Sequence, residues 1–204
     1  MNTTNIFVEI LIVGIQASVW TILLVLSIFG VDWLPNSWSS LNNWNALVTI
    51  IVLATWYTLG IISDRIASVL FSGFANPKKT LQKFAVVRNM AQISDKDIRV
   101  AIMYQEEKVS SYLEYFRSRA RIVRATTLNL LLITVFGSAF VLSRCSQIGC
   151  MPKASTLMLI IGMGALLTLT SWIIHGVIEI GYENRMAQVG HKFKEYSPKS
   201  HPPE

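Results

Sequence analysis

The first apolar stretch of the chain, residues 6–30, reads IFVEILIVGIQASVWTILLVLSIFG. Its polar side chains are one carboxylate, Glu9, one amide, Gln16, and a few hydroxyls. A helix rises about 1.5 Å per residue, so this stretch is long enough to cross the roughly 30 Å of hydrocarbon in a bilayer. We therefore predict that it is a transmembrane helix.

The composition of the whole chain also indicates a membrane protein. Of its 204 residues, 52% are hydrophobic and only 15% are charged, and the mean hydropathy is +0.45. Soluble domains carry roughly 25% charged residues, so the excess apolar surface is expected to face lipid. The length allows one compact unit, and no internal repeat of the kind found in solenoids is present.

Three further apolar stretches are expected to cross the membrane. The second span covers residues 44–63 and follows a loop with Trp33 and Trp38, whose indole rings favour the head-group boundary. The third span covers residues 125–142 and the fourth covers residues 154–180. We therefore predict an all-α integral membrane protein that forms a four-transmembrane-helix bundle.

The segment between the second and third spans, residues 65–124, is expected to form a helical hairpin that extends both helices out of the membrane. Ser94, three residues before Asp97, resembles a capping box at the start of a helix. Apolar residues then recur at spacings of three, four or seven, with no Gly or Pro before Gly137. The third helix is therefore predicted to run unbroken from the Ser94 cap into lipid.

Basic residues are distributed very unequally between the two sides of this bundle. Arg65 and residues 78–124 together hold twelve Lys and Arg, the tail from Arg185 holds four, and the two opposite loops hold two. Basic loops favour the cytoplasmic side of a membrane. We expect both termini and the hairpin to be cytoplasmic, with residues 1–193 forming the membrane domain and residues 194–204 a disordered tail.

Three side chains of the first span are candidates for the lining of a pore: Glu9, Gln16 and Trp20. In a symmetric oligomer, rings of Glu9 carboxylates would attract cations, and Gln16 amides would replace part of an ion's hydration shell. In the alternative, Glu9 interacts with the helix dipole and Gln16 hydrogen-bonds a neighbouring helix. Both interpretations stay open at this point.

A charged cluster is expected where the spans meet the cytoplasm, formed by Asp64, Arg65, Arg124, His175 and Glu179. His175 and Glu179 are four residues apart and share one helix face. Histidine titrates near neutral pH, so proton transfer or pH sensing is one interpretation, and a local hydrogen bond or ion pair is the other. Two ligands are too few for a closed metal site, so neither a metal nor another cofactor is predicted.

Four arginines precede the third span: Arg117, Arg119, Arg121 and Arg124. From their spacing we expect them to be spread around the helix and to contact anionic lipid head groups rather than to form one binding edge. Lipid also accounts for the net charge of +6, so no nucleic-acid partner is expected.

Two further features concern helix packing and the outer side of the bundle. In the fourth span, Gly164 and Thr168 form a pair of small residues four apart, which allows close approach of a neighbouring helix. In the short outer loop, Cys145 and Cys150 are candidates for a disulfide if that compartment is oxidising, and are free thiols otherwise.

The sequence contains no phosphate-binding loop, nucleophile elbow, paired-histidine zinc helix or dinucleotide glycine pattern, so we expect a non-enzymatic protein. The preferred hypothesis is a homo-oligomeric ion channel or pore-forming subunit that is controlled through its cytoplasmic hairpin. One alternative is a membrane anchor or scaffold whose hairpin recruits a soluble partner. The other is an interfacial lipid-modifying enzyme that uses the charged boundary cluster.

Overall fold

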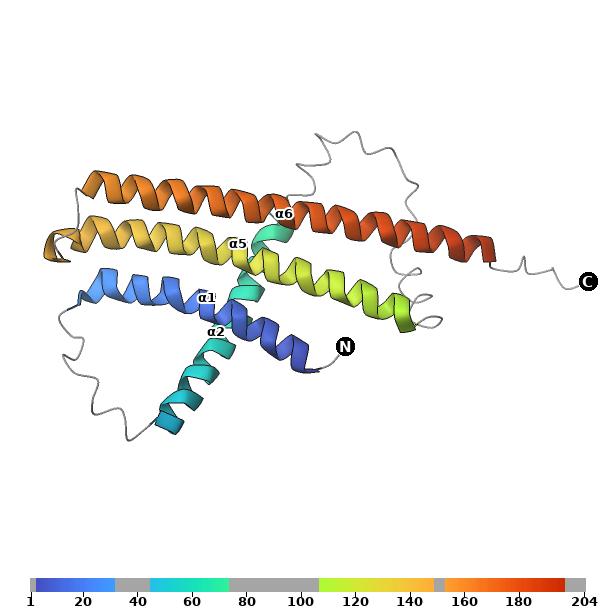
Figure 1. Ribbon diagram of the computed structural model, residues 1–204, viewed down its shortest axis with the longest axis horizontal. Coiled ribbons are helices and arrows are strands. Elements are labelled where there is room, and N and C mark those ends of the chain that lie inside the picture. The colour runs from blue at the N-terminus through green and yellow to red at the C-terminus, as the bar shows by residue number, and fades with distance from the viewer. Residues whose placement is uncertain (1–2, 32–44, 74–106, 149–152, 197–204) are drawn as a thin grey trace, which may run out of the picture.

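The computed structural model describes residues 3–31, 45–73, 107–148 and 153–196 (Figure 1). Within these residues it has four α-helices, which are α1 (Thr3–Phe29), α2 (Asn45–Gly73), α5 (Glu107–Ile148) and α6 (Lys153–Tyr196). Each of the four contains a segment that is long and apolar enough to cross a membrane. The all-α fold with four apolar helices is therefore confirmed, and the chain is a multi-pass membrane protein.

Two of the helices are much longer than a bilayer is thick. Helix α5 has 42 residues and α6 has 44, which correspond to about 63 and 66 Å, or twice the hydrocarbon thickness. They pack side by side and continue together past the N-terminal end of α1 (Figure 1). We call this projecting pair of helix ends, residues 107–117 and 183–196, the stem.

The structure bears on only part of the predicted hairpin and tail. Helix α2 continues without a break from its apolar segment through Arg65 to Gly73. Residues 74–106, with the predicted helix start at Ser94, lie outside the described residues. Helix α6 ends at Tyr196, so the first three residues of the expected tail are helical, and residues 197–204 are outside the described residues.

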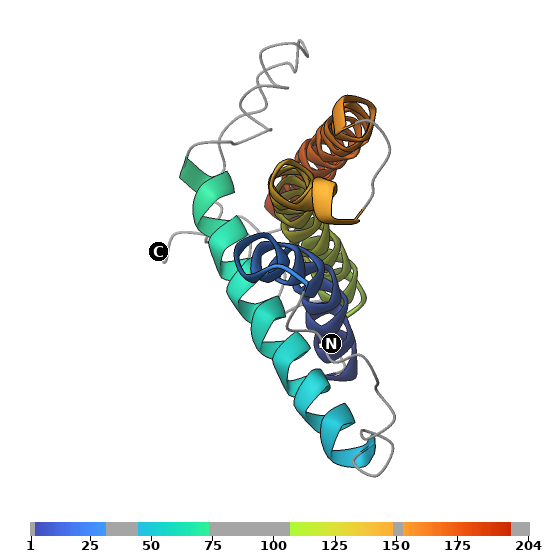
Figure 2. The same ribbon diagram turned by 90° about the vertical axis from the view of Figure 1, so that its left-hand side faces the viewer.

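Helix α5 is the central element of the bundle. It packs against α1, α2 and α6, and Figure 1 shows it between α1 and α6 while α2 crosses behind. Figure 2, turned by 90°, shows α2 as a long diagonal helix beside α1. Helix α6 is therefore positioned mainly by α5, whereas α2 packs mainly on α1, and α1 packs on both α2 and α5.

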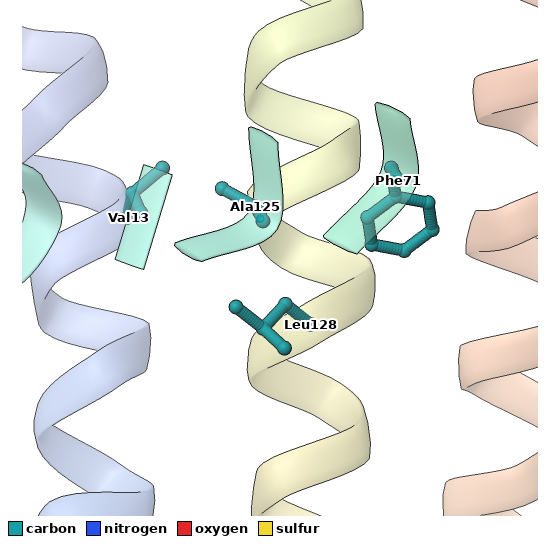
Figure 3. Close-up of a cluster of buried hydrophobic side chains, with 5 residues drawn as sticks. Val13, Phe71, Ala125 and Leu128 are labelled. Carbon is teal, nitrogen blue, oxygen red and sulfur yellow. The ribbon is translucent and has the colours of Figure 1, made fainter. Parts of the chain in front are cut away.

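A small apolar core lies where α1, α2 and α5 meet (Figure 3). It is built from Val13 of α1, Ala67 and Phe71 of α2, and Ala125 and Leu128 of α5. Many large apolar side chains of α1, α2 and α6 are instead exposed on the surface of the bundle. Such a surface is stable in hydrocarbon, where apolar side chains gain little by leaving lipid for protein.

Buried hydrogen bonds fix the relative positions of the helices, which this small apolar core does not determine by itself. Asn129 of α5 has no exposed surface, and its Nδ2 donates to the carbonyl oxygen of Val13 at 3.1 Å. Its Oδ1 accepts from Ser63 Oγ of α2 at 2.7 Å and from Trp20 Nε1 of α1 at 3.2 Å. Because an unpaired polar group in hydrocarbon costs several kcal/mol, Asn129 fixes three helices relative to one another.

Helices α5 and α6 are joined by hydroxyl groups and by a close approach at a glycine. Thr127 Oγ1 and Ser171 Oγ lie 2.8 Å apart in a buried hydrogen bond. A Cβ atom placed on Gly164 would lie 2.0 Å from Thr134 Oγ1, whereas one on Gly162 would have nothing within 4 Å. The close approach expected at Gly164 is therefore made to α5 of the same chain.

Helices α1 and α2 cross at two glycines that bring their backbones into contact. A Cβ atom on Gly14 would lie 1.7 Å from the carbonyl oxygen of Trp56. A Cβ atom on Gly60 would lie 2.1 Å from the carbonyl oxygen of Ile10. Even the methyl group of alanine would therefore push the two backbones apart at either position.

The C-terminal end of α1 is hydrogen-bonded to α5. Gly30 has a φ of +80°, and its N–H donates to the carbonyl oxygen of Leu26 at 3.0 Å, as in a helix C-cap. Arg144 Nη2 of α5 donates to the carbonyl oxygen of Ile28 at 3.0 Å. A cation at a helix C-terminus is favourable because it complements the helix dipole.

We expect the substitution Gly14→Ala to destabilise the bundle by about 1–3 kcal/mol, because the added methyl group overpacks the contact between α1 and α2. The measurement is the midpoint of thermal unfolding of the protein in detergent. Gly162→Ala is the matched control, since a Cβ there meets nothing and alanine favours a helix by roughly 1 kcal/mol. Equal midpoints for Gly14→Ala and the unsubstituted protein would contradict the close crossing.

Candidate functional site

A cleft of about 620 Å³ lies between α2, α5 and α6, at the level where charged residues replace apolar ones. We call it the boundary cleft. All five members of the predicted charged cluster line it: Asp64, Arg65, Arg124, His175 and Glu179. Its volume lies within the roughly 300–1,000 Å³ that is typical of small-molecule sites. The structure thus brings together residues from three helices that are far apart in the sequence.

An ion pair closes one side of the boundary cleft. Arg124 Nη2 of α5 donates to Asp64 Oδ1 of α2 at 3.0 Å. The two side chains are 22% and 23% exposed, so the pair is partly shielded from water. A charged pair that is partly buried is costly to break because one charge is then left without its partner. This pair therefore holds α2 against α5 next to the cleft.

His175 of α6 packs at the cleft wall with only 2% of its surface exposed. Its ring meets Phe71 of α2 edge-on, with the ring centroids 5.6 Å apart. Its Nε2 lies 3.8 Å from Glu179 Oε1, which is too long for a hydrogen bond, and its Nδ1 has no hydrogen-bond partner among the described residues. His175 thus contributes packing between α6 and α2.

Three of the four arginines before the third span form one edge of the cleft. Arg117, Arg121 and Arg124 all line it, because spacings of four and three residues bring side chains back to one face of α5. Arg119 is not part of this lining, and its guanidinium carbon lies 4.3 Å from the ring centroid of Tyr115. Three of the four arginines thus share one face of α5, as their spacing allows, and the expected contacts of all four with lipid head groups stay a prediction.

Most of these guanidinium groups have no carboxylate partner. Arg65, Arg117 and Arg121 make no ion pair or hydrogen bond within the part of the chain that the structure describes, whereas Arg124 is paired with Asp64. Glu114 and Glu179 also line the cleft, and each interacts with another group of the protein. The cleft lining holds four arginines against three carboxylates, so it carries a net positive charge, and three of its guanidinium groups, on α2 and α5, keep free donors.

The three candidate pore residues lie together on one face of α1, and that face packs against α5. Glu9 accepts a hydrogen bond from Ser118 Oγ, and Gln16 Oε1 accepts one from Thr126 Oγ1 at 3.0 Å. Trp20 donates to the buried amide of α5 described above. Pore lining in an oligomer stays a prediction, since within one chain these side chains are hydrogen-bonded to a neighbouring helix.

Two further predictions concern the outer cysteines and metal binding. Cys150 lies outside the described residues, so the disulfide with Cys145 stays a prediction. Among the described residues, no group of three or more His, Cys, Asp and Glu side chains is arranged to hold a metal ion.

Comparison of the chain with models of known protein families, with curated proteins and with solved structures finds no match. The function is therefore inferred from the residues of the bundle and the boundary cleft.

We expect Asp64→Asn to lower the free energy of unfolding by about 1–3 kcal/mol, because the partly buried guanidinium of Arg124 loses its charged acceptor. The measurement is thermal unfolding in detergent, in a cycle that also includes Arg124→Gln and the double substitution. Because both single changes remove the same pair, the double substitution is expected to cost less than their sum. Strictly additive losses would contradict a direct interaction between the two side chains.

Proposed function

We propose that this multi-pass membrane protein binds an anionic ligand in the boundary cleft. The observation that carries the proposal is the presence of Arg65, Arg117 and Arg121 on the cleft wall without an ion-pair partner in the described part of the chain. Charges held near one another repel, so a bound anion would relieve an arrangement that the protein leaves unbalanced.

The side-chain chemistry favours a phosphate-bearing ligand. A guanidinium group is planar, stays charged at any physiological pH, and offers paired donors that match the oxygens of a phosphate. Arginines on α2 and α5 can approach such a group from two directions, since both helices line the cleft. An anionic lipid head group is the form of phosphate that is most abundant at this depth of a membrane.

The charge asymmetry of the chain supports a cytoplasmic position for the cleft. Its arginines belong to the strongly basic side of the bundle, and basic segments favour the cytoplasmic side. We accordingly propose that both termini and the stem are cytoplasmic. Anionic lipids of the cytoplasmic leaflet would then meet the cleft directly.

The geometry of the cleft favours binding over catalysis. The enzyme hypothesis uses the charged boundary cluster, in which His175 is the side chain that titrates near neutral pH and could exchange a proton with a substrate. With only 2% of its surface exposed, this side chain has little area for contact with a substrate. The arginines Arg65 and Arg117, in contrast, are exposed. A binding role uses the groups that are accessible.

We expect the purified protein to retain phosphatidylglycerol in preference to phosphatidylcholine when native mass spectra are recorded from mixed micelles. The double substitution Arg117→Gln and Arg121→Gln is expected to weaken this retention at least tenfold, since each charge-assisted hydrogen bond is worth about 1.5–3 kcal/mol. Arg119→Gln is the matched control, because it removes the same charge from the same helix outside the cleft. Equal retention of the two lipids, or equal losses in cleft and control variants, would refute the proposal.

A second candidate function, a self-associating channel, is favoured by the line of polar groups along α1. Glu9, Gln16 and Trp20 meet polar partners on α5 over about 16 Å, nearly half of the length of the span. Conduction along this line requires the hydrogen bonds between α1 and α5 to open, and ligand binding next to α5 offers a way to control that opening. The anchor hypothesis requires no such rearrangement.

If the chain forms a channel, the purified protein should give currents in planar bilayers, and Glu9→Gln should lower cation conductance because it removes the carboxylate of α1. Gln16→Asn would serve as a comparison that shortens a neutral side chain on the same helix face. Bilayers that stay silent with correctly folded protein would eliminate the channel and leave the anchor.

A further inference from the structure

We propose that the boundary cleft is selective for a ligand with two phosphate groups, rather than for the single phosphodiester of common anionic lipids. This inference rests on the proposed anion-binding function and specifies its ligand. It concerns the arginines that lack a partner, Arg65, Arg117 and Arg121, together with the size of the cleft.

The first argument is the number of donors. Arg124 is already paired with Asp64 at 3.0 Å. Glu114 and Glu179 line the cleft as well, but Arg65, Arg117 and Arg121 make no ion pair within the described residues, so their guanidinium donors are open to a ligand. A phosphodiester has two unbridged oxygens and can form a bidentate pair with one guanidinium group at a time. A ligand with two phosphate groups offers more oxygens and can pair with more of these arginines.

The second argument is the arrangement of the donors. Arg117 and Arg121 are four residues apart on α5, which places their Cα atoms about 6 Å apart along the helix axis. Arg65 comes from α2, a different wall of the cleft. Two separate phosphate groups can therefore each meet a guanidinium group from a different direction, which a single phosphate cannot exploit fully.

The third argument is size. The cleft volume of about 620 Å³ is far larger than one phosphate group with its few heavy atoms requires. Water would occupy the rest of the space around a single phosphate and weaken its attraction to the arginines by screening. A larger, doubly phosphorylated group would displace more of this water and strengthen the same contacts.

The shared chemistry, two linked phosphates, is available from a soluble molecule or from a lipid head group. The test measures dissociation constants of the full chain in phosphatidylcholine nanodiscs. The soluble probes are inorganic phosphate, pyrophosphate and citrate, and citrate controls for negative charge without phosphate. The lipid probes are phosphatidylglycerol and diacylglycerol pyrophosphate, added to the nanodiscs in equal amounts.

We expect a diphosphate probe to bind at least tenfold more tightly than its monophosphate counterpart in at least one of the two forms. Preference for pyrophosphate over phosphate indicates a soluble ligand, and preference confined to the pyrophosphate lipid indicates a head group. Arg65→Gln and Arg117→Gln are each expected to abolish the preference, while Arg119→Gln retains it. Unchanged thermal unfolding midpoints show that these exposed substitutions leave the fold intact.

The outcomes separate this inference from the function on which it rests. Equal affinity within both pairs, phosphate with pyrophosphate and phosphatidylglycerol with the pyrophosphate lipid, with binding lost on Arg117→Gln, overturns the diphosphate inference and keeps the anion site. Citrate binding as tight as pyrophosphate binding overturns it as well, because charge alone would then suffice. No binding of any anionic probe, or equal weakening by Arg119→Gln, overturns both proposals.

Discussion

The arrangement of this bundle depends on the need of one buried amide for hydrogen bonds in hydrocarbon. Asn129 sits on the central helix with no exposed surface, and its partners come from α1 and α2. Apolar contacts alone would let helices slide against one another, because lipid chains offer nearly the same contacts. An amide has few geometries that satisfy both its oxygen and its nitrogen. It therefore sets the register of three helices, and the glycines of α1 and α2 allow the close approach that this register requires.

The boundary cleft is a consequence of the same register. Arg124 lies five residues before Asn129 on α5, and Asp64 directly follows Ser63, the α2 partner of that amide. The helix register in which Asn129 makes its hydrogen bonds also places Arg124 beside Asp64, so the ion pair forms about one turn away along the bundle. Arg121 and Arg117 then lie on the cleft side of α5, about one and two turns before Arg124. Hydrogen bonding in the apolar interior thus determines where positive charge gathers at the boundary.

The sequence was sufficient to predict the features that depend on hydrophobicity and on the position of a residue along an apolar segment. Four apolar helices follow from composition, and the residues of the charged cluster share a cleft because each stands where an apolar segment ends. Contacts between particular helix faces could not be predicted in this way. Gly14 and Gly60 meet partner backbones only at the crossing that α1 and α2 adopt, and the partners of Asn129 depend on helix rotation. The shared face of Arg117 and Arg121, in contrast, was present in their spacing and was missed.

The length of α5 makes it a lever with its pivot inside the membrane. Asn129 lies 22 residues from the helix start at Glu107, or about 33 Å, while Arg121 lies about 12 Å from the same pivot. A rigid helix that tilts about Asn129 moves its far tip nearly three times as far as it moves the cleft. Because α6 packs along α5, a tilt of α5 would carry the neighbouring part of α6 with it. A small shift of α5 around an anion bound in the cleft would thus displace the tip of the stem nearly three times as far.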